Sequence, residues 1–491
     1  MTSTVHRAAH AVNPRAACEG VTALAARLEP WQVELCSRPE IVDEWLELHG
    51  SPVNVLDPTP MARNAAELQA AAARFGLDLG IYFARKANKA LGFVDEARRL
   101  GLGIDLASER ELRQVLDRRV PPGDLVMTAA VKPRSLLELC VASGTTVVVD
   151  NADELERLTT IARESGRVTP IAMRLAPVLA DDRLPTRFGF DEDEAIAAAE
   201  KHCPAGREPS VRIDGVHFHL DGYDAGDRVS ALAQSLDLVD ALRRHGHQPA
   251  FIDMGGGIPI SYLASSLQWD RFWREHRKGL LGHREPLTFE GNGLGLIAHN
   301  GEILGAPAVY PYHQQPTRGD WLTEVLAGRA GAHGSVAEAL RGRDLQLRCE
   351  PGRSLLDGCG LTAARVEHRK QRRDGTWLIG VAMNRTQCRS ASADFLVDPL
   401  LLRPATKDPA SATKPIEGYL AGAYCIEREL LTWRRLSFPE GVEVGDIVVF
   451  PNTAGYLMHI LESSSHQIPL ARNLILGADR ESCLDPIDQP I

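Results

Sequence analysis

From about residue 79 the sequence alternates short apolar runs with longer stretches of helical periodicity. Short β-branched or apolar runs are typical of buried strands, and apolar residues at helical spacing are typical of helices packed on them. Eight strands are predicted, over 79–84, 103–107, 124–128, 146–150, 170–174, 215–219, 250–254 and 345–350. Helices are predicted between them, including 91–100, 110–116, 133–143, 152–165, 191–202 and 228–244. Eight successive βα units predict an α/β fold, a (β/α)8 barrel of the TIM type.

The pattern changes after Glu350. Segments 362–367, 376–382 and 446–450 read as strands without crossover helices, which predicts a mainly antiparallel β domain built from residues 21–57 and 361–491. The barrel is then expected over 58–360, with an enlarged segment at 262–345 that covers the active-site end or a partner subunit. Residues 1–20 are expected to form a mobile tail.

Composition narrows the function classes. The 491 residues carry a net charge of -10 and are 44% hydrophobic, so neither nucleic acid nor a membrane is an expected partner, and a small molecule is. The nine cysteines are scattered and form no C-x-x-C pair, which argues against a disulfide framework and against a zinc site. No metal is expected. We recognise no secretion signal in the N-terminal stretch, so a cytoplasmic location is expected.

Polar residues follow the predicted strands, where a parallel barrel gathers them at one mouth. Lys86 lies just past the first strand. Partial desolvation and the neighbouring Arg85 are expected to disfavour its ammonium form and so favour a Schiff base, although a solvated lysine is the ordinary alternative. The other strand ends supply Asp105, Ser108, Arg174, His219, Gly255, Gly256, Gly257, Glu350 and Arg353.

Among these strand ends, the glycine triplet and Arg353 are suited to bind an anion, and Glu350 is suited to bind a ring nitrogen. The triplet Gly255–Gly257 allows backbone N–H groups to cradle a phosphate, with Arg353 as a second contact, though a tight turn and a surface charge are the plain alternatives. Glu350 can hold a protonated pyridine nitrogen. Its alternative is a structural ion pair with Arg353 or Arg174.

The remaining strand-end residues have structural alternatives as well. His219 can stack on a planar ring, or it can be a core histidine. Asp105 and Ser108 can act in the site, or they can cap the helix that begins at Glu109. Together, the lysine, phosphate cradle, carboxylate and imidazole describe a site for pyridoxal 5'-phosphate.

With these residues, the chain resembles the fold-type III pyridoxal-phosphate decarboxylases, which include the ornithine, arginine and diaminopimelate decarboxylases. The resemblance is strongest to diaminopimelate decarboxylase-like proteins. The strings that carry the resemblance occur in the family's order across roughly residues 55 to 465. They are Phe-Ala-Arg-Lys86-Ala-Asn, Gly-Ile-Asp105-Leu-Ala-Ser108, His-Phe-His219, Asp-Met-Gly-Gly-Gly257, Glu350-Pro-Gly-Arg353, Cys425 and Ala-Gly-Tyr456.

The resemblance implies an alanine-racemase-like barrel and a role for each matched residue. Lys86 would form the aldimine with the cofactor, and Cys425, donated across a head-to-tail homodimer, would protonate the product carbanion. The remaining cofactor contacts would be Asp105, Arg174, His219 stacked on the ring, Glu350 at the pyridine nitrogen, and Gly255, Gly256, Gly257, Arg353 and Tyr456 at the phosphate.

Departures from the family pattern cluster where the substrate should bind. The family's Gly-Ser pair after the histidine is Asp221-Gly222 here, and the acidic residue after the cysteine is Ile426. An Asp and a Gly of the family are replaced by Gly380 and Ala382, and Lys407 stands where a tyrosine is expected. The candidate substrate contacts are Arg353, Arg403, Glu427 and Glu429.

Three functions remain open at this stage. The first is decarboxylation of a polar or diamino amino acid, with release of carbon dioxide and an amine. The second is racemisation or epimerisation, which would need a base on the face opposite Lys86. The third is a regulatory homologue that binds the cofactor without catalysis, which the changes at Asp221 and Ile426 make plausible.

Overall fold

The computed structural model describes residues 15–179, 186–204, 210–390, 395–404, 414–477 and 481–489. It divides into two compact units, each assembled from discontinuous segments. The barrel unit comprises Pro58–Ile260 and Gln314–Asp357. The β unit comprises Met1–Asp57, Ser261–His313 and Gly358–Ile491.

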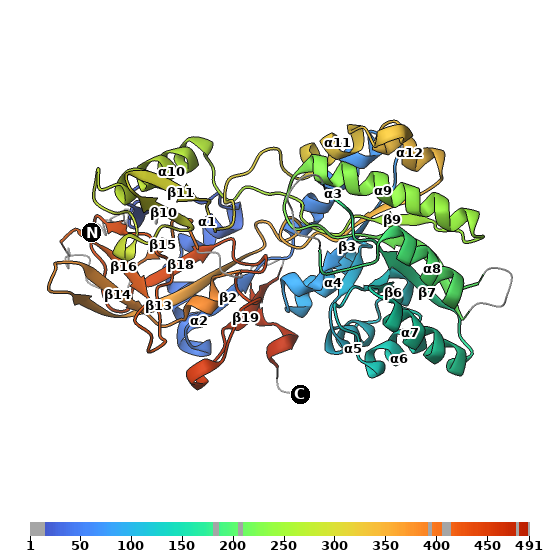
Figure 1. Ribbon diagram of the computed structural model, residues 1–491. Coiled ribbons are helices and arrows are strands. Elements are labelled where there is room, and N and C mark those ends of the chain that lie inside the picture. The colour runs from blue at the N-terminus through green and yellow to red at the C-terminus, as the bar shows by residue number, and fades with distance from the viewer. Residues whose placement is uncertain are drawn as a thin grey trace, which may run out of the picture. The chain divides into compact units, whose positions relative to one another are not determined.

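The barrel unit contains a closed ring of eight parallel strands in the order β12-β3-β4-β5-β6-β7-β8-β9 (Figure 1). These strands are β3 (Leu79–Ala84), β4 (Gly103–Leu106), β5 (Leu125–Met127), β6 (Thr146–Val149), β7 (Thr169–Arg174), β8 (Val211–His217), β9 (Phe251–Asp253) and β12 (Gln346–Cys349). The sequence-based prediction of a (β/α)8 barrel is therefore confirmed. Because neighbouring strands run in parallel, their carboxyl ends meet at one mouth.

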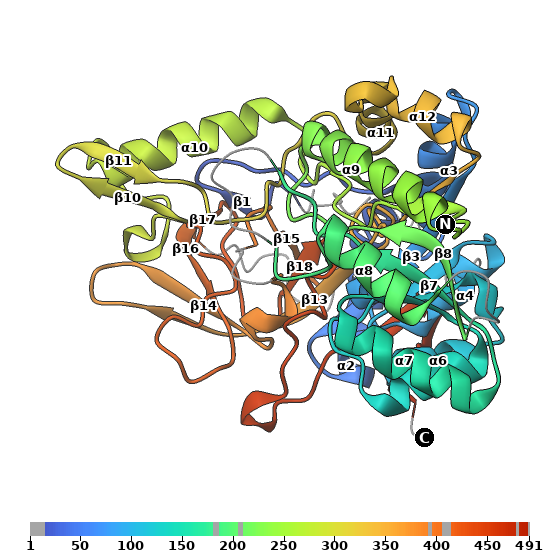
Figure 2. The same ribbon diagram turned by 45° about the vertical axis from the view of Figure 1, so that its right-hand side comes forward.

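Helices surround this ring (Figure 2). They are α3 (Pro60–Ala73), α4 (Leu91–Arg99), α5 (Glu109–Asp117), α6 (Arg134–Ser143), α7 (Ala152–Ser165), α8 (Glu192–His202), α9 (Ala225–Arg244), α11 (Arg318–Ala327) and α12 (Val336–Gly342). Polar side chains set several helix starts: Ser108, Asn151 and Asp224 each accept a backbone N–H of the first turn. Inside the ring, Tyr82, Val126, Val148, Ala172 and Phe251 pack as a buried cluster.

The β unit is a mixed, mainly antiparallel sheet of ten strands. Its strands are β1 (Glu19–Gly20), β2 (Val53–Leu56), β13 (Gly360–Gln371), β14 (Trp377–Val381), β15 (Leu400–Leu402), β16 (Ile416–Ala421), β17 (Leu436–Phe438), β18 (Ile447–Pro451), β19 (Arg472–Leu476) and β20 (Ser482–Leu484). The long β13 pairs antiparallel with β2, β14 and β18, whereas β14–β16 and β2–β19 are parallel. Helices α1 (Pro30–Cys36) and α2 (Pro39–His49) bury Trp31 and Trp45 against this sheet.

The long segment expected to enlarge the barrel is divided between the units, which corrects the prediction for 262–345. Its first part forms α10 (Ser266–Leu280) and the hairpin β10 (Leu296–His299) and β11 (Glu302–Gly305), and it belongs to the β unit. Backbone and ring contacts hold it there: Arg435 N–H donates to the carbonyl of Leu287 at 2.8 Å, and the Phe289 ring meets Tyr419 edge-on at 5.1 Å. Only the part from Gln314 stays with the barrel, as α11 and α12.

The expected tail at 1–20 also needs a correction. Residues 1–14 lie outside the described residues. Glu19 and Gly20, however, form β1 and pair with Ser437 and Leu436 of β17, so the N-terminal segment is already part of the β unit by residue 19.

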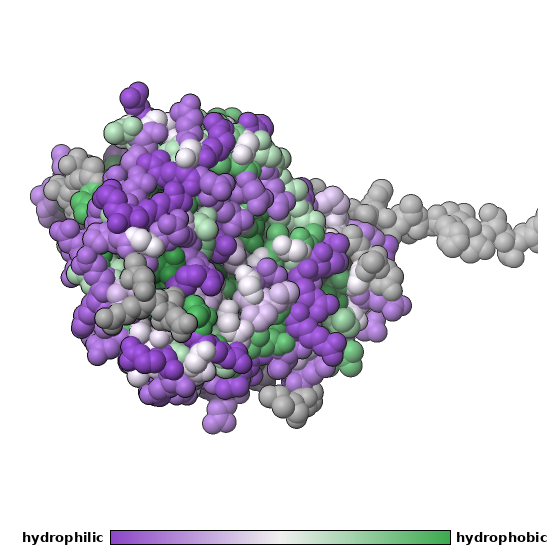
Figure 3. All heavy atoms as spheres, turned by 90° about the vertical axis from the view of Figure 1, so that its right-hand side faces the viewer, coloured by the Kyte–Doolittle hydropathy of each residue, from purple (hydrophilic) through white to green (hydrophobic). Residues whose placement is uncertain are grey.

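Hydrophilic side chains predominate on the face shown in Figure 3. Of the described helices, none combines the length and the apolar character that crossing a bilayer requires.

A buried ion pair fastens the start of the β unit to its sheet. The Arg434 guanidinium contacts the carboxylate of Asp398 and donates to the carbonyls of Thr22 and Leu396. Asp398 also accepts the N–H of Leu24 at 2.8 Å. Both charged side chains are buried, so neither can turn to water if its partner is lost.

Replacing Arg434 by methionine is therefore expected to lower the free energy of unfolding by about 3–5 kcal/mol, because Asp398 is left as a buried charge without its partner. The matched control is Arg428→Met, which removes an exposed ion pair with Glu290 and should cost at most about 1 kcal/mol. Urea unfolding of both variants measures the difference. Equal losses would contradict the structural role of the buried pair.

Candidate active site

Lys86 lies at the mouth of the barrel between two carboxylates. It sits in the short turn Arg85–Ala87 that follows β3, and its Nζ lies 2.8 Å from Asp105 Oδ2 and 4.0 Å from Glu350 Oε2. Asp105 is in place because Ala84 of β3 and Asp105 of β4 are directly paired in the barrel. Burial and the nearby Glu350 raise the pKa of Asp105, and the Lys86 ammonium opposes that shift.

The structure shows what the Arg85 side chain contacts. Its buried guanidinium donates to Gln114 Oε1 at 2.6 Å and to the carbonyl of Lys89 at 3.0 Å. The carboxylates of Asp105 and Glu350 lie within ion-pair distance of the Lys86 amine.

Glu350 is the buried centre of the site. It follows β12, and its Oε1 lies 3.2 Å from His217 Nε2, yet no hydrogen-bond partner of suitable geometry meets that oxygen in the described part of the chain. One atom each of His217, Asp253 and Glu350 lies within 4.8 Å of the others, a spacing that a cation or a shared proton can bridge. Burial raises the pKa of both Glu350 and Asp253, and burial lowers the pKa of His217.

His219 is held by the glycine triplet. The N–H of Gly256 donates to His219 Nδ1 at 3.1 Å, so this nitrogen is the acceptor and the ring orientation is fixed. Burial lowers the pKa of His219 well below its usual value, which keeps the imidazole neutral. A neutral, fixed imidazole is suited to packing on the face of a planar ring.

The triplet itself tolerates no side chain. Gly255 and Gly257 have φ values of 66° and 75°, in the left-handed region that favours glycine. A Cβ on Gly255 would lie 2.5 Å from His219 Nδ1, and one on Gly256 would lie 2.8 Å from the carbonyl of Glu350. Two of the three N–H groups already donate hydrogen bonds, to Asp253 Oδ1 and to His219 Nδ1. Fewer N–H groups of the triplet are therefore available to a phosphate than the sequence suggested.

Arg174 and Ser108 complete the rim. Arg174, the last residue of β7, reaches Asp150 Oδ1 at 3.2 Å and lies over the Phe188 ring at 4.2 Å. Burial lowers its pKa, with Asp150 opposing the shift. Ser108 accepts the N–H of Glu111, so it caps the helix that follows.

Known proteins resemble this chain in sequence and in fold. A family model described as "Pyridoxal-dependent decarboxylase, pyridoxal binding domain" matches residues 62–287. The chain is 32% identical over 440 residues to the "Uncharacterized protein y4yA" of Sinorhizobium fredii, covering 89% of this chain and 90% of that one. It is 26% identical over 340 residues to the diaminopimelate decarboxylase of Pseudomonas aeruginosa, covering 67% of each.

The chain belongs to the fold-type III pyridoxal-dependent decarboxylase family. Among solved structures, it is similar to the diaminopimelate decarboxylase of M. jannaschii in complex with L-lysine, with a TM-score of 0.67 and 19% identity over 90% of this chain and 91% of that one. That likeness shows the shared fold.

The residues at the barrel mouth fit the pyridoxal group that the family name implies. Glu350 Oε1 is a buried acceptor without a hydrogen-bond partner in the described residues, as a ring nitrogen would require. His219 offers a fixed ring face, the triplet leaves room only for a close backbone approach, and Lys86 supplies the amine. Arg353 follows Glu350 in the turn after β12, at the same mouth.

Several other predicted residues of this family member lie in the β unit. Cys425 is exposed and lines a cavity of about 520 Å³ together with Glu427, Glu429, Lys370 and Arg372. The structure thus brings the cysteine and the two glutamates to one place. Their predicted roles toward the substrate stay predictions.

Three of the β-unit side chains also have structural surroundings of their own. Glu429 is buried, where it accepts the N–H of Arg385 at 2.8 Å, and burial raises its pKa. Arg403 donates to the carbonyls of Glu440 and Gly441 at 2.8 and 2.7 Å. Tyr456 has a φ of 70°, unusual for a bulky residue and found most often where function constrains the backbone.

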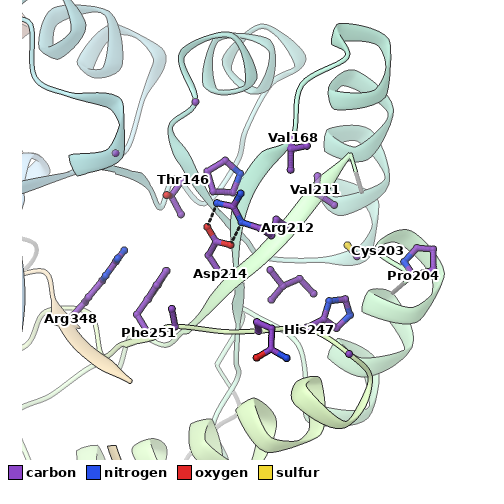
Figure 4. Close-up of a pocket in the computed structure, with 17 residues that line it drawn as sticks. Thr146, Val168, Cys203, Pro204, Val211, Arg212, Asp214, His247, Phe251 and Arg348 are labelled. Carbon is purple, nitrogen blue, oxygen red and sulfur yellow. Dashed lines mark hydrogen bonds and ion pairs between the residues drawn. The ribbon is translucent and has the colours of Figure 1, made fainter. Parts of the chain in front are cut away.

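A larger cavity, of about 860 Å³, opens at the other end of the barrel (Figure 4). It is lined by residues at the starts of strands, such as Thr146 and Val211, whereas the active-site residues follow the strand ends. Arg212 is paired there with Asp214, and Arg348 packs over the Phe251 ring at 3.6 Å. Its volume therefore does not make it the catalytic site.

Sequence reasoning missed two members of the buried cluster. His217 and Asp253 stand within the quoted strings His-Phe-His219 and Asp-Met-Gly-Gly-Gly257, but neither had been given a role. The sequence did contain a signal for both residues, because each ends a barrel strand. Asp253 ends β9, which pairs with β12, the strand that leads to Glu350, and His217 ends β8, which pairs with β9.

The raised pKa of Asp253 predicts a pH dependence of stability without cofactor. Asp253 in the folded protein keeps its proton at pH values where the unfolded aspartate has lost it. The free energy of unfolding of the wild type therefore falls as pH rises from the unfolded pKa to the folded pKa. Asp253→Asn removes the effect, and its unfolding free energy relative to wild type should rise between pH 4.5 and 8 in urea titrations.

The control for this experiment is an aspartate whose pKa is shifted in the other direction. A hydrogen bond from Arg343 lowers the pKa of Asp240, so the stability that this group contributes is present above the pKa of the unfolded aspartate and is lost only at more acidic pH. The difference between Asp240→Asn and wild type should therefore stay nearly constant from pH 4.5 to 8. Parallel pH profiles for the two variants would contradict the raised pKa of Asp253 in the folded protein.

Proposed function

We propose that the protein is a pyridoxal 5'-phosphate-dependent decarboxylase that converts a polar or diamino amino acid into carbon dioxide and an amine. The observation that carries this proposal is Lys86 Nζ, held 2.8 Å from Asp105 and 4.0 Å from a buried Glu350 whose Oε1 has no hydrogen-bond partner in the described residues. A diaminopimelate decarboxylase at 26% identity and a lysine complex of a similar fold support the substrate class.

Each residue at the mouth has a task in this reaction. Lys86 would hold the cofactor through its amine. Glu350 would keep a proton on the ring nitrogen, and the cofactor would supply the electron sink that decarboxylation requires. His219 packs on the ring, while Arg353 and the glycine turn bind the phosphate. Tyr456 is assigned to the phosphate as well.

Product formation requires a proton donor at the carbon that has lost its carboxylate. Cys425 is assigned to this step, from a partner subunit in a homodimer with shared active sites. Glu427 and Glu429 line the same cavity and are assigned to the substrate. Arg353 and Arg403 are the candidate contacts for substrate carboxylates.

The lysine is tested first. Addition of cofactor to the apoprotein should produce a visible absorption band in wild type and in the control Lys89→Ala, but not in Lys86→Ala. Carbon dioxide release from the accepted amino acid should fall at least about 10³-fold in Lys86→Ala. An unchanged band in that variant would contradict the proposal.

The same screen separates the other functions. A bound cofactor with racemised substrate and no carbon dioxide would assign racemisation. A bound cofactor with no turnover of any amino acid would assign a regulatory role, which the exposed Ile426, in place of the family's acidic residue, makes the second candidate.

Cys425 is tested against the other exposed cysteine, Cys483. Cys425→Ala should bind cofactor normally and form amine about 10²–10⁴-fold more slowly, because a general acid has been removed. Cys483→Ala should match wild type. Equal rates for the two variants would remove Cys425 from the mechanism.

The shared site has its own test. Mixing Lys86→Ala with Cys425→Ala should restore part of the activity, because a mixed dimer contains one site with both groups intact. If the mixture stays as inactive as its components, each site is built from one subunit.

A further inference from the structure

Arg228 is a buried cation without an acidic partner in contact. It lies in the first turn of α9, and only 1% of the residue is exposed. Its Nη2 donates to three backbone carbonyls, of Leu220 at 3.2 Å, Gly222 at 3.1 Å and Gly256 at 3.1 Å. Its Nε has no hydrogen-bond partner in the described part of the chain. Burial lowers the pKa of Arg228 to about 10, so it remains charged at neutral pH.

The acidic residues around Arg228 do not neutralise it by contact. Asp221, Asp224 and Asp227 raise its pKa from a distance. No carboxylate of the described residues lies within 4.0 Å of Arg228, the limit for an ion pair. A buried charge without a counter-ion is costly, and such groups are usually paired with a second ion. The missing ion is best sought among the ligands of the site.

The position of Arg228 indicates which ligand this is. A Cβ on Gly257 would lie 2.1 Å from its Nη2, so the guanidinium packs directly against the glycine triplet. Its other two acceptors belong to the turn after His219, where this chain has Asp221-Gly222 instead of the family's Gly-Ser. Arg228 thus joins the two turns that flank the expected phosphate.

The hydrogen bonds also orient the N–H groups of these turns. In a trans peptide the carbonyl and the following N–H point in opposite directions. Because the carbonyls of Gly256 and Leu220 point at Arg228, the N–H groups of Gly257 and Asp221 point away from it. Neither N–H has a hydrogen-bond acceptor in the described residues, so both remain available to an anion.

We propose that Arg228 is a positioning residue of the phosphate site, which holds the 220–222 turn against Gly256 and provides the positive charge that the cofactor phosphate balances. This inference rests on the proposed cofactor. It assigns to Arg228 the support for phosphate binding that the serine hydroxyl no longer gives at Asp221-Gly222.

The experiment compares two ligands that share the ring and differ in the phosphate. Apoprotein is titrated with pyridoxal 5'-phosphate and with pyridoxal, and the ratio of the two dissociation constants isolates the phosphate contribution. In Arg228→Met this ratio should shrink by about 10- to 100-fold relative to wild type, the effect expected for a charge-assisted contact. The affinity for pyridoxal itself should change little.

The control is Arg243→Met at the other end of the same helix. Arg243 also donates to backbone carbonyls, of Pro249 and Arg343, both at 3.0 Å, but away from the triplet. Its ratio should equal that of wild type. Should Arg228→Met fail to fold, Arg228→Gln keeps a donor without the charge and should show the same loss of discrimination.

The outcomes are separable. A wild-type ratio in a folded Arg228 variant overturns this inference and leaves the proposed function standing. Equal losses for both ligands overturn it too, because they assign Arg228 to the shape of the ring pocket alone. Failure of wild type to bind either ligand would instead contradict the proposed function.

Discussion

The contact between Lys86 and Asp105 places an amine at the mouth of a barrel where buried acids gather. Asp105 is fully buried, and a carboxylate in that position requires a positive partner or a proton. Lys86 is that partner, 2.8 Å away, because the pairing of β3 with β4 sets Ala84 beside Asp105. The position of the reactive amine therefore follows from strand register.

The mouth of the barrel contains buried acidic and basic side chains that do not all neutralise one another. Asp105, Asp253 and Glu350 are buried, and burial raises the pKa of each. On the other side of the glycine triplet, Arg228 is a buried cation with no acid in contact among the described residues. A ligand with a protonated ring nitrogen at one end and a phosphate at the other matches both imbalances.

Much of the barrel could be predicted from the sequence because its signals are local. Each strand is a short apolar run, and a parallel barrel puts every strand end at one mouth, so Lys86, Asp105 and Glu350 could be grouped without a structure. Side-chain direction could not be read in this way. Arg85 stands next to Lys86 in sequence, but its guanidinium donates to Gln114, a contact that adjacency in sequence does not reveal.

Long-range packing accounts for the other differences. Phe289 belongs to the β unit because its ring meets Tyr419, a contact between residues far apart in the chain that no periodicity encodes. Arg228 stands at the start of the helix predicted over 228–244. Its contacts with the carbonyls of Gly222 and Gly256 appear only in the structure. The β-unit residues Cys425, Glu427 and Tyr456 keep roles that rest on the family resemblance.

The central claim is that Lys86 holds the cofactor at the mouth of the barrel, and peptide mapping tests it most directly. Borohydride reduction of the cofactor-loaded protein fixes the cofactor to the lysine that binds it, and mass spectrometry of the digest identifies that lysine. The account predicts the added pyridoxyl mass on the peptide that contains Lys86. The same mass on a different lysine, or on none, would contradict it.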